Sequence, residues 1–206
     1  MAKKEDDALI IRAIDNRYKL EYERITNEQL SANTRELMKT SEIDELTGLS
    51  NRYGLKKRFR KLSGIARFQK AKICLCLFDI DEFKVYNDEY GHLRGDECLR
   101  EIAEILRESV NKEEYFVSRY GGDEFVILGI NKTDEELRKF VEKLFKNVNA
   151  ARMPFLNHAE ADNVTISMGV INKLVEKECS LTDFIHGADR NLYKAKKGGK
   201  NQFVLE

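Results

Sequence analysis

The 206-residue sequence has no tryptophan, only one proline and no net charge. A single proline argues against long structured loops. The 36 basic and 36 acidic residues balance, so no global electrostatic field indicates nucleic acid or an anionic membrane as a partner. No apolar run approaches the roughly 20 residues that a membrane span needs. We therefore expect no nucleic-acid partner and no membrane segment in this chain.

Cysteine is also scarce. The four cysteines, Cys74, Cys76, Cys98 and Cys179, show no spacing typical of metal ligands. Cys74 and Cys76 alternate within an apolar segment, so both side chains should face one side of a buried strand. Small core hydrophobes in a reducing compartment are the simplest interpretation, and we expect a cytoplasmic protein. The apolar patch that follows Met1 is too short for a signal peptide.

The amino-acid composition changes along the chain. Residues 1–43 contain neither glycine nor proline, and good helix formers alternate with charges. A partial apolar heptad consists of Ile11, Ile14, Tyr18, Ile25 and Ala32. It is interrupted at three positions where apolar d residues should stand, which hold Glu21, Glu28 and Arg35. Two interpretations stay open for this segment. It is either an N-terminal helix that acts as a stalk or signalling element, or a segment without such a role, as a solvated helix or an element truncated from a larger protein would be.

From Asp44 onward, over segment 44–206, helix and strand signals alternate. The first half predicts a helix over Asn51–Phe68, a buried strand over Lys72–Ile80 and a helix with the face Leu99, Ile102, Ala103, Leu106 and Val110. The second half predicts a hairpin over 115–130, a helix after the capping box Thr133–Glu136, a strand over Val164–Val170, a helix over Leu181–Leu192 and a strand over Asn201–Leu205. These elements predict an α/β sandwich, in which helices surround a mixed central sheet with an antiparallel hairpin at its centre.

The most informative segment is Arg119–Phe125, which reads Arg-Tyr-Gly-Gly-Asp-Glu-Phe. Two adjacent glycines between apolar stretches are typical of a two-residue hairpin turn, because glycine tolerates positive φ angles. Adjacent carboxylates at such a tip repel each other, and a divalent metal ion would offset the repulsion. The glycines would also let a bulky anion approach the backbone.

A third carboxylate, Asp79, comes where the buried strand meets solvent, the usual place for a functional side chain in such sheets. If that strand pairs with the hairpin, Asp79, Asp123 and Glu124 converge. Mg²⁺ or Mn²⁺ favours hard oxygen ligands and phosphates, so these acids predict a metal site for in-line displacement on a triphosphate. A solvated acidic turn would explain Asp123 or Glu124 singly, but not all three acids together.

Two features after Asp79 suit a phosphate. Lys84 lies five residues further on, where its charge would stabilise the transferring phosphate. The backbone N–H groups of Glu82 and Phe83, near a predicted helix start, suit phosphate oxygens.

Arg119–Phe125 resembles the signature of the GGDEF family, the bacterial diguanylate cyclases. Four further segments resemble other motifs of that family, in the family's order: Asp44–Arg52, Phe78–Asp96, Ser167–Val170 and Ala188–Lys196. The resemblance spans about Asp44–Phe203. It implies the palm-like, ferredoxin-like fold of nucleotidyl cyclases and polymerases, with 44–206 as the catalytic domain.

The resemblance also implies individual roles. Metal binding is implied for Asp79, Asp123, Glu124 and the Ile80 carbonyl, with Asp123 also the proton acceptor for the ribose 3′-hydroxyl. Phosphate binding is implied for Lys196 and Lys200, and guanine recognition for Asn87 and Asp96. His92 has two open interpretations: a substrate contact, and a residue that packs the turn at Gly91. Lys200 departs from the family, where arginine is usual, so bidentate contact is lost while the charge stays.

The implied reaction joins two GTP into cyclic di-(3′→5′)-GMP and releases two pyrophosphates. One domain has a single site, so we expect an active homodimer that residues 1–43 or an upstream sensor would control. Many relatives carry an R-x-x-D product-inhibition site, but this chain has Lys112–Tyr115 there, so we expect no strong feedback inhibition. The main alternative is a catalytically weak module that binds GTP or cyclic di-GMP. A scaffold protein would leave the three acids unexplained, and Asn87 and Asp96 disfavour a nucleotidyl cyclase that uses ATP.

Overall fold

The computed structural model describes residues 17, 19–21, 24–26, 42–155, 163–176 and 179–206, and the chain divides into two units after residue 41. Each unit is described by itself. In the first, the described residues are helical and exposed, Ile25 among them. The other four apolar residues of the predicted heptad, and its charged residues Glu28 and Arg35, lie outside the described residues. The stalk therefore stays a prediction.

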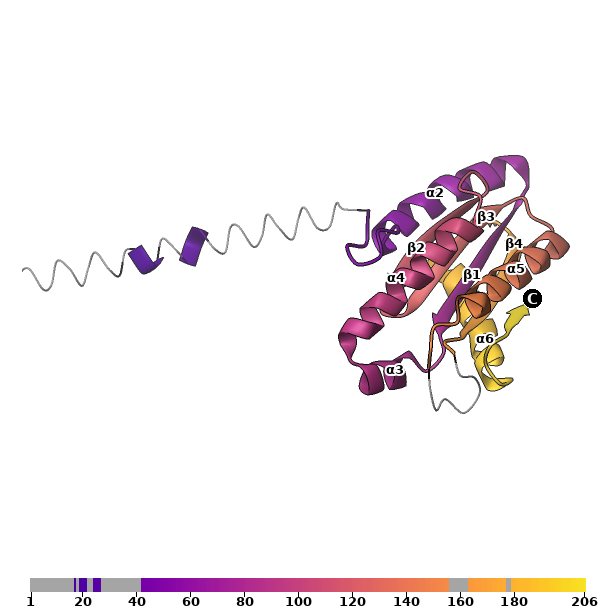
Figure 1. Ribbon diagram of the computed structural model, residues 1–206. Coiled ribbons are helices and arrows are strands. Elements are labelled where there is room, and N and C mark those ends of the chain that lie inside the picture. The colour runs from indigo at the N-terminus through magenta and orange to yellow at the C-terminus, as the bar shows by residue number, and fades with distance from the viewer. Residues whose placement is uncertain (1–16, 18, 22–23, 27–41, 156–162, 177–178) are drawn as a thin grey trace, which may run out of the picture. The chain divides into compact units, whose positions relative to one another are not determined.

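The second unit, residues 42–206, alternates helices and strands (Figure 1). Its elements are α2 (Arg52–Gln69), β1 (Lys72–Ile80), α3 (Phe83–Tyr90), α4 (His92–Ser109), β2 (Tyr115–Gly121), β3 (Glu124–Ile130), α5 (Asp134–Ala151), β4 (Ile166–Leu174), α6 (Leu181–Lys197) and β5 (Phe203–Leu205). Helix α5 begins at the predicted capping box, in which Thr133 and Glu136 satisfy each other's backbone N–H groups. Among the described residues, none of the helices is both long and apolar enough to cross a bilayer.

The strands form one mixed five-stranded sheet in the order β2-β3-β1-β4-β5. Strands β4 and β5 are parallel, and every other neighbouring pair is antiparallel. The prediction that the hairpin lies at the centre is wrong, because β1 is the central strand and the β2–β3 hairpin forms one side of the sheet. Strand β1 takes the centre because it is apolar on both faces and is buried almost throughout.

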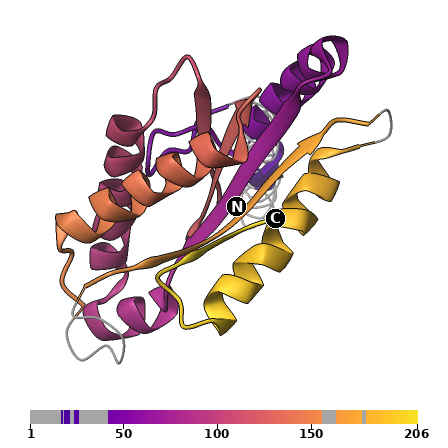
Figure 2. The same cartoon turned by 90° about the vertical axis from the view of Figure 1, so that its right-hand side faces the viewer.

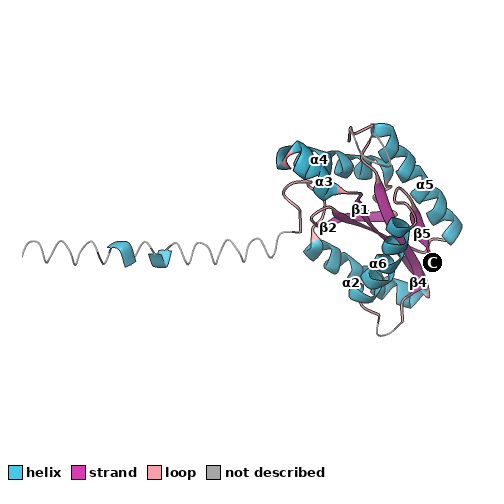
Figure 3. Cartoon of the chain, turned by 90° about the horizontal axis from the view of Figure 1, so that it is seen from below, coloured by secondary structure: helices cyan, strands magenta, loops and turns pink. Residues whose placement is uncertain are grey.

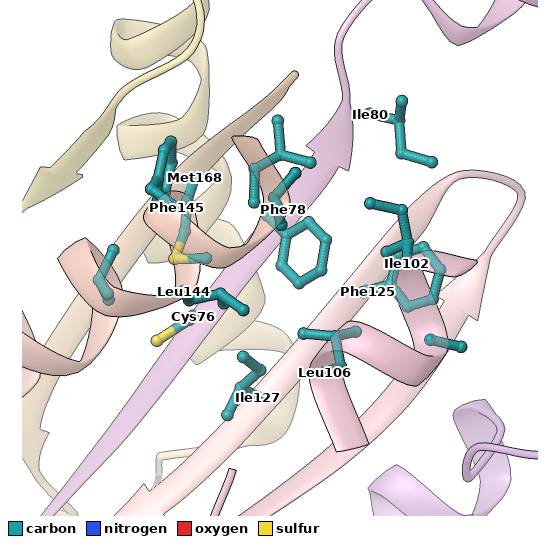
Figure 4. Packing of buried hydrophobic residues seen from close by; sticks show 14 of the residues in the cluster. Cys76, Phe78, Ile80, Ile102, Leu106, Phe125, Ile127, Leu144, Phe145 and Met168 are labelled. Atoms are coloured by element: carbon teal, nitrogen blue, oxygen red, sulfur yellow. The ribbon is translucent and has the colours of Figure 1, made fainter. Parts of the chain in front are cut away.

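Helices cover both faces of the sheet, with α4 and α5 on one face and α2 and α6 on the other (Figure 2 and Figure 3). Alternate side chains of β1 enter opposite layers: Cys74, Cys76 and Phe78 pack with α4 and α5, whereas Ile73 packs with α2 and α6. Figure 4 shows the first layer, where the rings of Phe78 and Phe125 stack with centroids 5.2 Å apart. The shared face of Cys74 and Cys76 is thus confirmed. Burial raises the pKa of the Cys74 thiol to about 12, so that thiol stays protonated.

Candidate active site

Three carboxylates lie where β1 meets the β2–β3 hairpin. In the β1–β3 ladder Asp79 is directly opposite Glu124, and Asp123 precedes Glu124 in the turn. Strand β1 does therefore pair with the hairpin, which is the condition under which we expected the three acids to converge. Asp79 also pairs with Ser167 of β4, so this acid is held in ladders on both sides.

The turn itself differs in one respect from the expectation. Gly121 still belongs to β2, and the two turn residues are Gly122 and Asp123. Only Gly122 has the positive φ angle, 55°, that favours glycine. The pairing register shifts between Arg119 and Gly121, which places an irregularity just before the turn. The tip therefore exposes both glycines while Asp123 and Glu124 are half-buried.

The environment of Asp79 is unusual for a carboxylate. Burial raises its pKa to about 6; an ion pair with Lys196 lowers the pKa, and the charges of Asp123 and Asp81 raise it further. Its Oδ2 atom accepts a hydrogen bond from Lys196 Nζ. Its Oδ1 atom is buried and has no hydrogen-bond partner among the described residues. A buried oxygen without a partner is costly, and a cation is one group that would satisfy it.

Glu124 shares this environment. Burial raises its pKa, the charges of Asp123 and Asp189 raise it further, and Lys196 and Arg52 lower it. Within the described residues, no three acidic, histidine or cysteine side chains are already arranged around one point as metal ligands. The donor set nevertheless fits a hard divalent cation, because it consists of carboxylates that repel each other and includes the unpartnered Oδ1 of Asp79.

The residues expected to contact phosphates lie around the start of α3. This helix begins at Phe83, so the N–H groups of Glu82 and Phe83 do belong to a helix N-terminus. Lys84 follows in the first turn of α3 and is exposed. Lys200 Nζ donates to Glu82 Oε1 at 2.6 Å, and Lys196 reaches the neighbouring Asp79. The structure thus brings both C-terminal lysines to the end of β1 where Asp79 and Glu82 lie.

The residues expected to read guanine lie at the junction of α3 and α4. Asn87 is on α3, and Asp96 follows Gly95 in the first turns of α4; both side chains are half-buried. A Cβ atom at residue 95 would lie 1.8 Å from Asn87 Oδ1, so only glycine allows this close approach. His92 is the first residue of α4 and is exposed. The Asn87 side chain therefore lies against α4 at Gly95, the residue before Asp96, whereas the role of His92 stays open.

The sequence model described as "Diguanylate cyclase, GGDEF domain" matches residues 41–202. This chain belongs to the GGDEF family.

Relatives of this GGDEF chain include diguanylate cyclase DosC of Escherichia coli (strain K12), which is 30% identical over 163 residues, or 79% of this chain and 35% of that protein. Diguanylate cyclase DgcP of Pseudomonas aeruginosa is 35% identical over 162 residues, or 79% of this chain and 23% of that protein. The chain therefore spans about a third of DosC and about a quarter of DgcP. The family match and these relatives show that the domain belongs to a family of nucleotidyltransferase-type enzymes.

Solved structures agree with the palm-like GGDEF fold. A crystal structure of the coiled coil and GGDEF domain of DgcB from Caulobacter crescentus, in complex with c-di-GMP, has a TM-score of 0.72. It is 25% identical to this chain, and the match covers 91% of this chain and 97% of that one. Diguanylate cyclase SiaD of Pseudomonas aeruginosa, solved with its activator SiaC, has a TM-score of 0.71 and 27% identity, with coverage of 100% and 79%.

Contacts made by Arg119, which we call the brace, support the Gly122–Asp123 turn and were not expected from the sequence. Arg119 Nε donates to the Gly122 carbonyl at 2.8 Å, and its Nη1 contacts both Asp44 carboxylate oxygens at 3.2 and 3.3 Å. Burial alone would raise the pKa of Asp44, but hydrogen bonds from Thr47 and the pairing with Arg119 outweigh it and hold the pKa below its usual value. Asp44 and Arg119 both lie in segments that resemble motifs of the family, Asp44–Arg52 and Arg119–Phe125. No local pattern pairs them, because 75 residues separate the two.

Sequence reasoning also missed Asp81, two residues after Asp79. Asp81 is only 2% exposed, and it accepts hydrogen bonds from Thr165 Oγ1 at 2.8 Å and Ser167 Oγ at 2.6 Å. Its own N–H donates to the Thr165 carbonyl at 2.9 Å. The alternation of Asp79 and Asp81 in the sequence would have flagged this residue as a second acid, but its partners lie more than 80 residues away.

Proposed function

We propose that this chain is an active diguanylate cyclase domain, which condenses two GTP into cyclic di-(3′→5′)-GMP and two pyrophosphates. The single observation that carries the proposal is the pairing of Asp79 with Glu124 beside Asp123, with Asp79 Oδ1 buried and unpartnered. These acids would be costly to hold together without a cation. Family membership supports the reaction class, because the matched relatives are named diguanylate cyclases.

In this proposal Asp79, Asp123, Glu124 and the Ile80 carbonyl hold Mg²⁺ or Mn²⁺. The bound cation would supply Lewis-acid activation of the 3′-hydroxyl and neutralise charge on the triphosphate. Asp123 accepts the proton of the ribose 3′-hydroxyl. It suits this role because it lies at the exposed end of the hairpin, next to Glu124, where a substrate hydroxyl has access.

The cationic side chains serve the phosphates. Lys84, exposed in the first turn of α3, stabilises charge that builds on the transferring phosphate. Lys196 and Lys200 bind phosphate oxygens, for which their ion pairs with Asp79 and Glu82 must exchange. The N–H groups of Glu82 and Phe83 add backbone donors at the start of α3.

Guanine specificity is assigned to the α3–α4 junction. The Asp96 carboxylate accepts from guanine N1–H and N2–H, and the Asn87 amide meets the acceptors of the base. Adenine lacks that pair of donors, so the same site favours GTP over ATP. The approach of the Asn87 side chain to Gly95, the residue before Asp96, supports joint action of the two residues on one base.

The two GTP molecules require two copies of this site. We infer an antiparallel homodimer of domains in which each copy contributes one nucleotide, because orientation of two bound substrates replaces a bimolecular encounter. Residues 1–43, or a sensor domain upstream, would control that dimer, and a cytoplasmic location would give access to GTP. DgcB, whose solved structure combines a coiled coil with a GGDEF domain, supports a helical element next to this domain.

The test is to incubate the purified chain with Mg²⁺ and GTP, with ATP as the control nucleotide, and to identify products by mass spectrometry. An Asp123→Ala/Glu124→Ala variant serves as the control protein. Cyclic di-GMP from the wild type alone is the expected result. No product at high enzyme concentration, where dimers form, would refute the cyclase proposal and leave a domain that binds nucleotide without turnover, for which GTP calorimetry is the next measurement.

A further inference from the structure

Asp81 is a buried carboxylate that the proposed reaction does not use. Three neutral donors satisfy it: the Thr165 and Ser167 hydroxyls on the β4 side, and the backbone N–H of Asn201 at 3.1 Å from Oδ2. Asn201 directly follows Lys200, one of the two lysines assigned to the phosphates. The carboxylate therefore connects the segment after β1 to the loop that carries Lys200.

The backbone is strained on both sides of this connection. Outside glycine, the described residues with positive φ angles are Lys70, Glu82, Asn131, Arg152, Lys200 and Asn201. Lys70 and Arg152 are C-caps, where a left-handed residue is ordinary. Glu82, Lys200 and Asn201, at 54°, 55° and 42°, all adjoin the Asp81 connection. Such conformations cost roughly 1–3 kcal/mol each and persist only where the surroundings enforce them.

Several contacts hold these residues in place. Lys200 N donates to the Ala195 carbonyl at 3.2 Å, Lys200 Nζ to Glu82 at 2.6 Å and Asn201 N to Asp81. The Asp81 contact fixes the Asn201 backbone to the sheet, because Asp81 is itself anchored to β4 through Ser167. The Gln202 carbonyl, which follows the strained pair, accepts from the Met168 N–H of β4 at 3.0 Å. An ionised carboxylate offers acceptor sites for all three donors, whereas an amide offers a single acceptor oxygen.

We propose that Asp81 is a positioning residue that holds the strained Lys200–Asn201 pair and thereby aims the Lys200 ammonium at the phosphates of GTP. This inference rests on the proposed function and extends it to a residue that would touch neither substrate nor metal. The arrangement also compensates for lysine in place of the usual arginine. A lysine has a flexible four-carbon stem and no fixed fork, so its position depends more on the backbone that carries it.

The kinetic test is a double-mutant cycle with Asp81→Asn and Lys200→Met. Asp81→Asn should raise the KM for GTP about tenfold, the effect of losing a hydrogen bond to a charged acceptor, with kcat changed less than threefold. In the Lys200→Met background the same substitution should raise KM less than threefold further, because its effect acts through Lys200. Asp88→Asn, the same chemical change at an exposed acid on α3, is the matched control and should leave KM unchanged.

A purely structural role for Asp81 gives a different pattern. Equal KM losses from Asp81→Asn in the wild-type and Lys200→Met backgrounds, or no KM loss at all, would overturn the proposal. If the wild type makes no cyclic product, the proposed function has failed, and the same cycle is then measured as the Kd for GTP by calorimetry.

Amide hydrogen exchange tests whether Asp81 holds the Asn201 backbone, and it does so independently of enzymatic activity. The Asn201 amide should be protected in the wild type and should exchange at least tenfold faster in Asp81→Asn. Amides of Leu75–Leu77 in the central strand should be unchanged, which separates local release of the loop from global unfolding. Equal exchange of Asn201 in both proteins would show that Asp81 does not hold the loop.

Discussion

The brace behind the GGDEF turn makes a quantitative prediction for Arg119→Ala. The substitution removes one hydrogen bond to the Gly122 carbonyl and the contacts with the Asp44 carboxylate. Both members of the ion pair are largely buried, with side-chain exposures of 14% for Arg119 and 23% for Asp44. Asp44 keeps two hydrogen bonds from Thr47, so no carboxylate is left without donors.

These contacts set the magnitude. A net hydrogen bond contributes about 1 kcal/mol, and a largely buried charge pair adds a similar amount, so the free energy of unfolding should fall by about 2 kcal/mol. For a domain of this size that loss lowers Tm by about 4–8 °C in a thermal melt followed by circular dichroism. Because the turn carries Asp123, kcat for cyclic di-GMP formation should also fall about tenfold.

Two further variants sharpen this prediction. Arg94 forms an ion pair with Glu97 in which both side chains are more than half exposed, so Arg94→Ala should change Tm by less than about 1 °C. Arg119→Lys keeps the charge but lacks the fork that reaches Gly122 and Asp44 together, and should lie between the wild type and Arg119→Ala. If Arg119→Ala melts within 1 °C of Arg94→Ala, the brace does not stabilise the domain and the reasoning is wrong.

Four other predictions concern Asp79, Lys200, product inhibition and the N-terminal segment. Burial raises the Asp79 pKa to about 6, from an ordinary value near 3.8, so the folded state binds this proton more tightly than the unfolded state and the domain loses stability as pH rises from about 4 to 6. The Tm of Asp79→Asn should therefore exceed that of the wild type by more at pH 7.5 than at pH 5, and the variant should lose at least 100-fold in cyclase activity. Equal differences in Tm at both pH values would contradict this. Lys200→Arg should improve kcat or KM for GTP in steady-state assays, and a variant no better than the wild type in either would count against bidentate contact. Added cyclic di-GMP should not inhibit at low micromolar concentration, since Tyr115 is buried against Phe140 where a relative would carry an acid; strong inhibition lost on Lys112→Ala would overturn that expectation. Deletion of residues 1–40 should lower specific activity in dilute enzyme, and unchanged activity there would remove the stalk from the mechanism.

The order and type of most elements were predictable because their signals are local. The run Lys72–Ile80 is apolar at nearly every position, and the structure has β1 at those bounds. The helix that begins after Thr133 was predictable from a side-chain pattern three residues long. The position of the hairpin was not, because the order of strands depends on which apolar faces meet across the whole sheet.

The candidate site also contains some residues that could be predicted from the sequence and some contacts that could not. Asp79, Asp123 and Glu124 stand out because acids at strand ends and turns contradict the apolar pattern around them. The contacts of Asp81 and Arg119 could not be predicted, since each residue acts through partners far along the chain. The strain at Lys200 and Asn201 was equally invisible, because both residues tolerate ordinary φ angles in most settings and only tertiary contacts impose the left-handed ones.

The central place of β1 gives the acids of this GGDEF domain different mechanical freedom. Asp79 lies between two antiparallel ladders, so displacing its backbone disturbs the pairing of β1 with both β3 and β4. Asp123 lies in a two-residue turn at the end of a hairpin on one side of the sheet. The site thus joins an acid held by two ladders to one held by a turn, and in the proposed reaction we expect the turn, rather than the centre of the sheet, to adjust to the nucleotide.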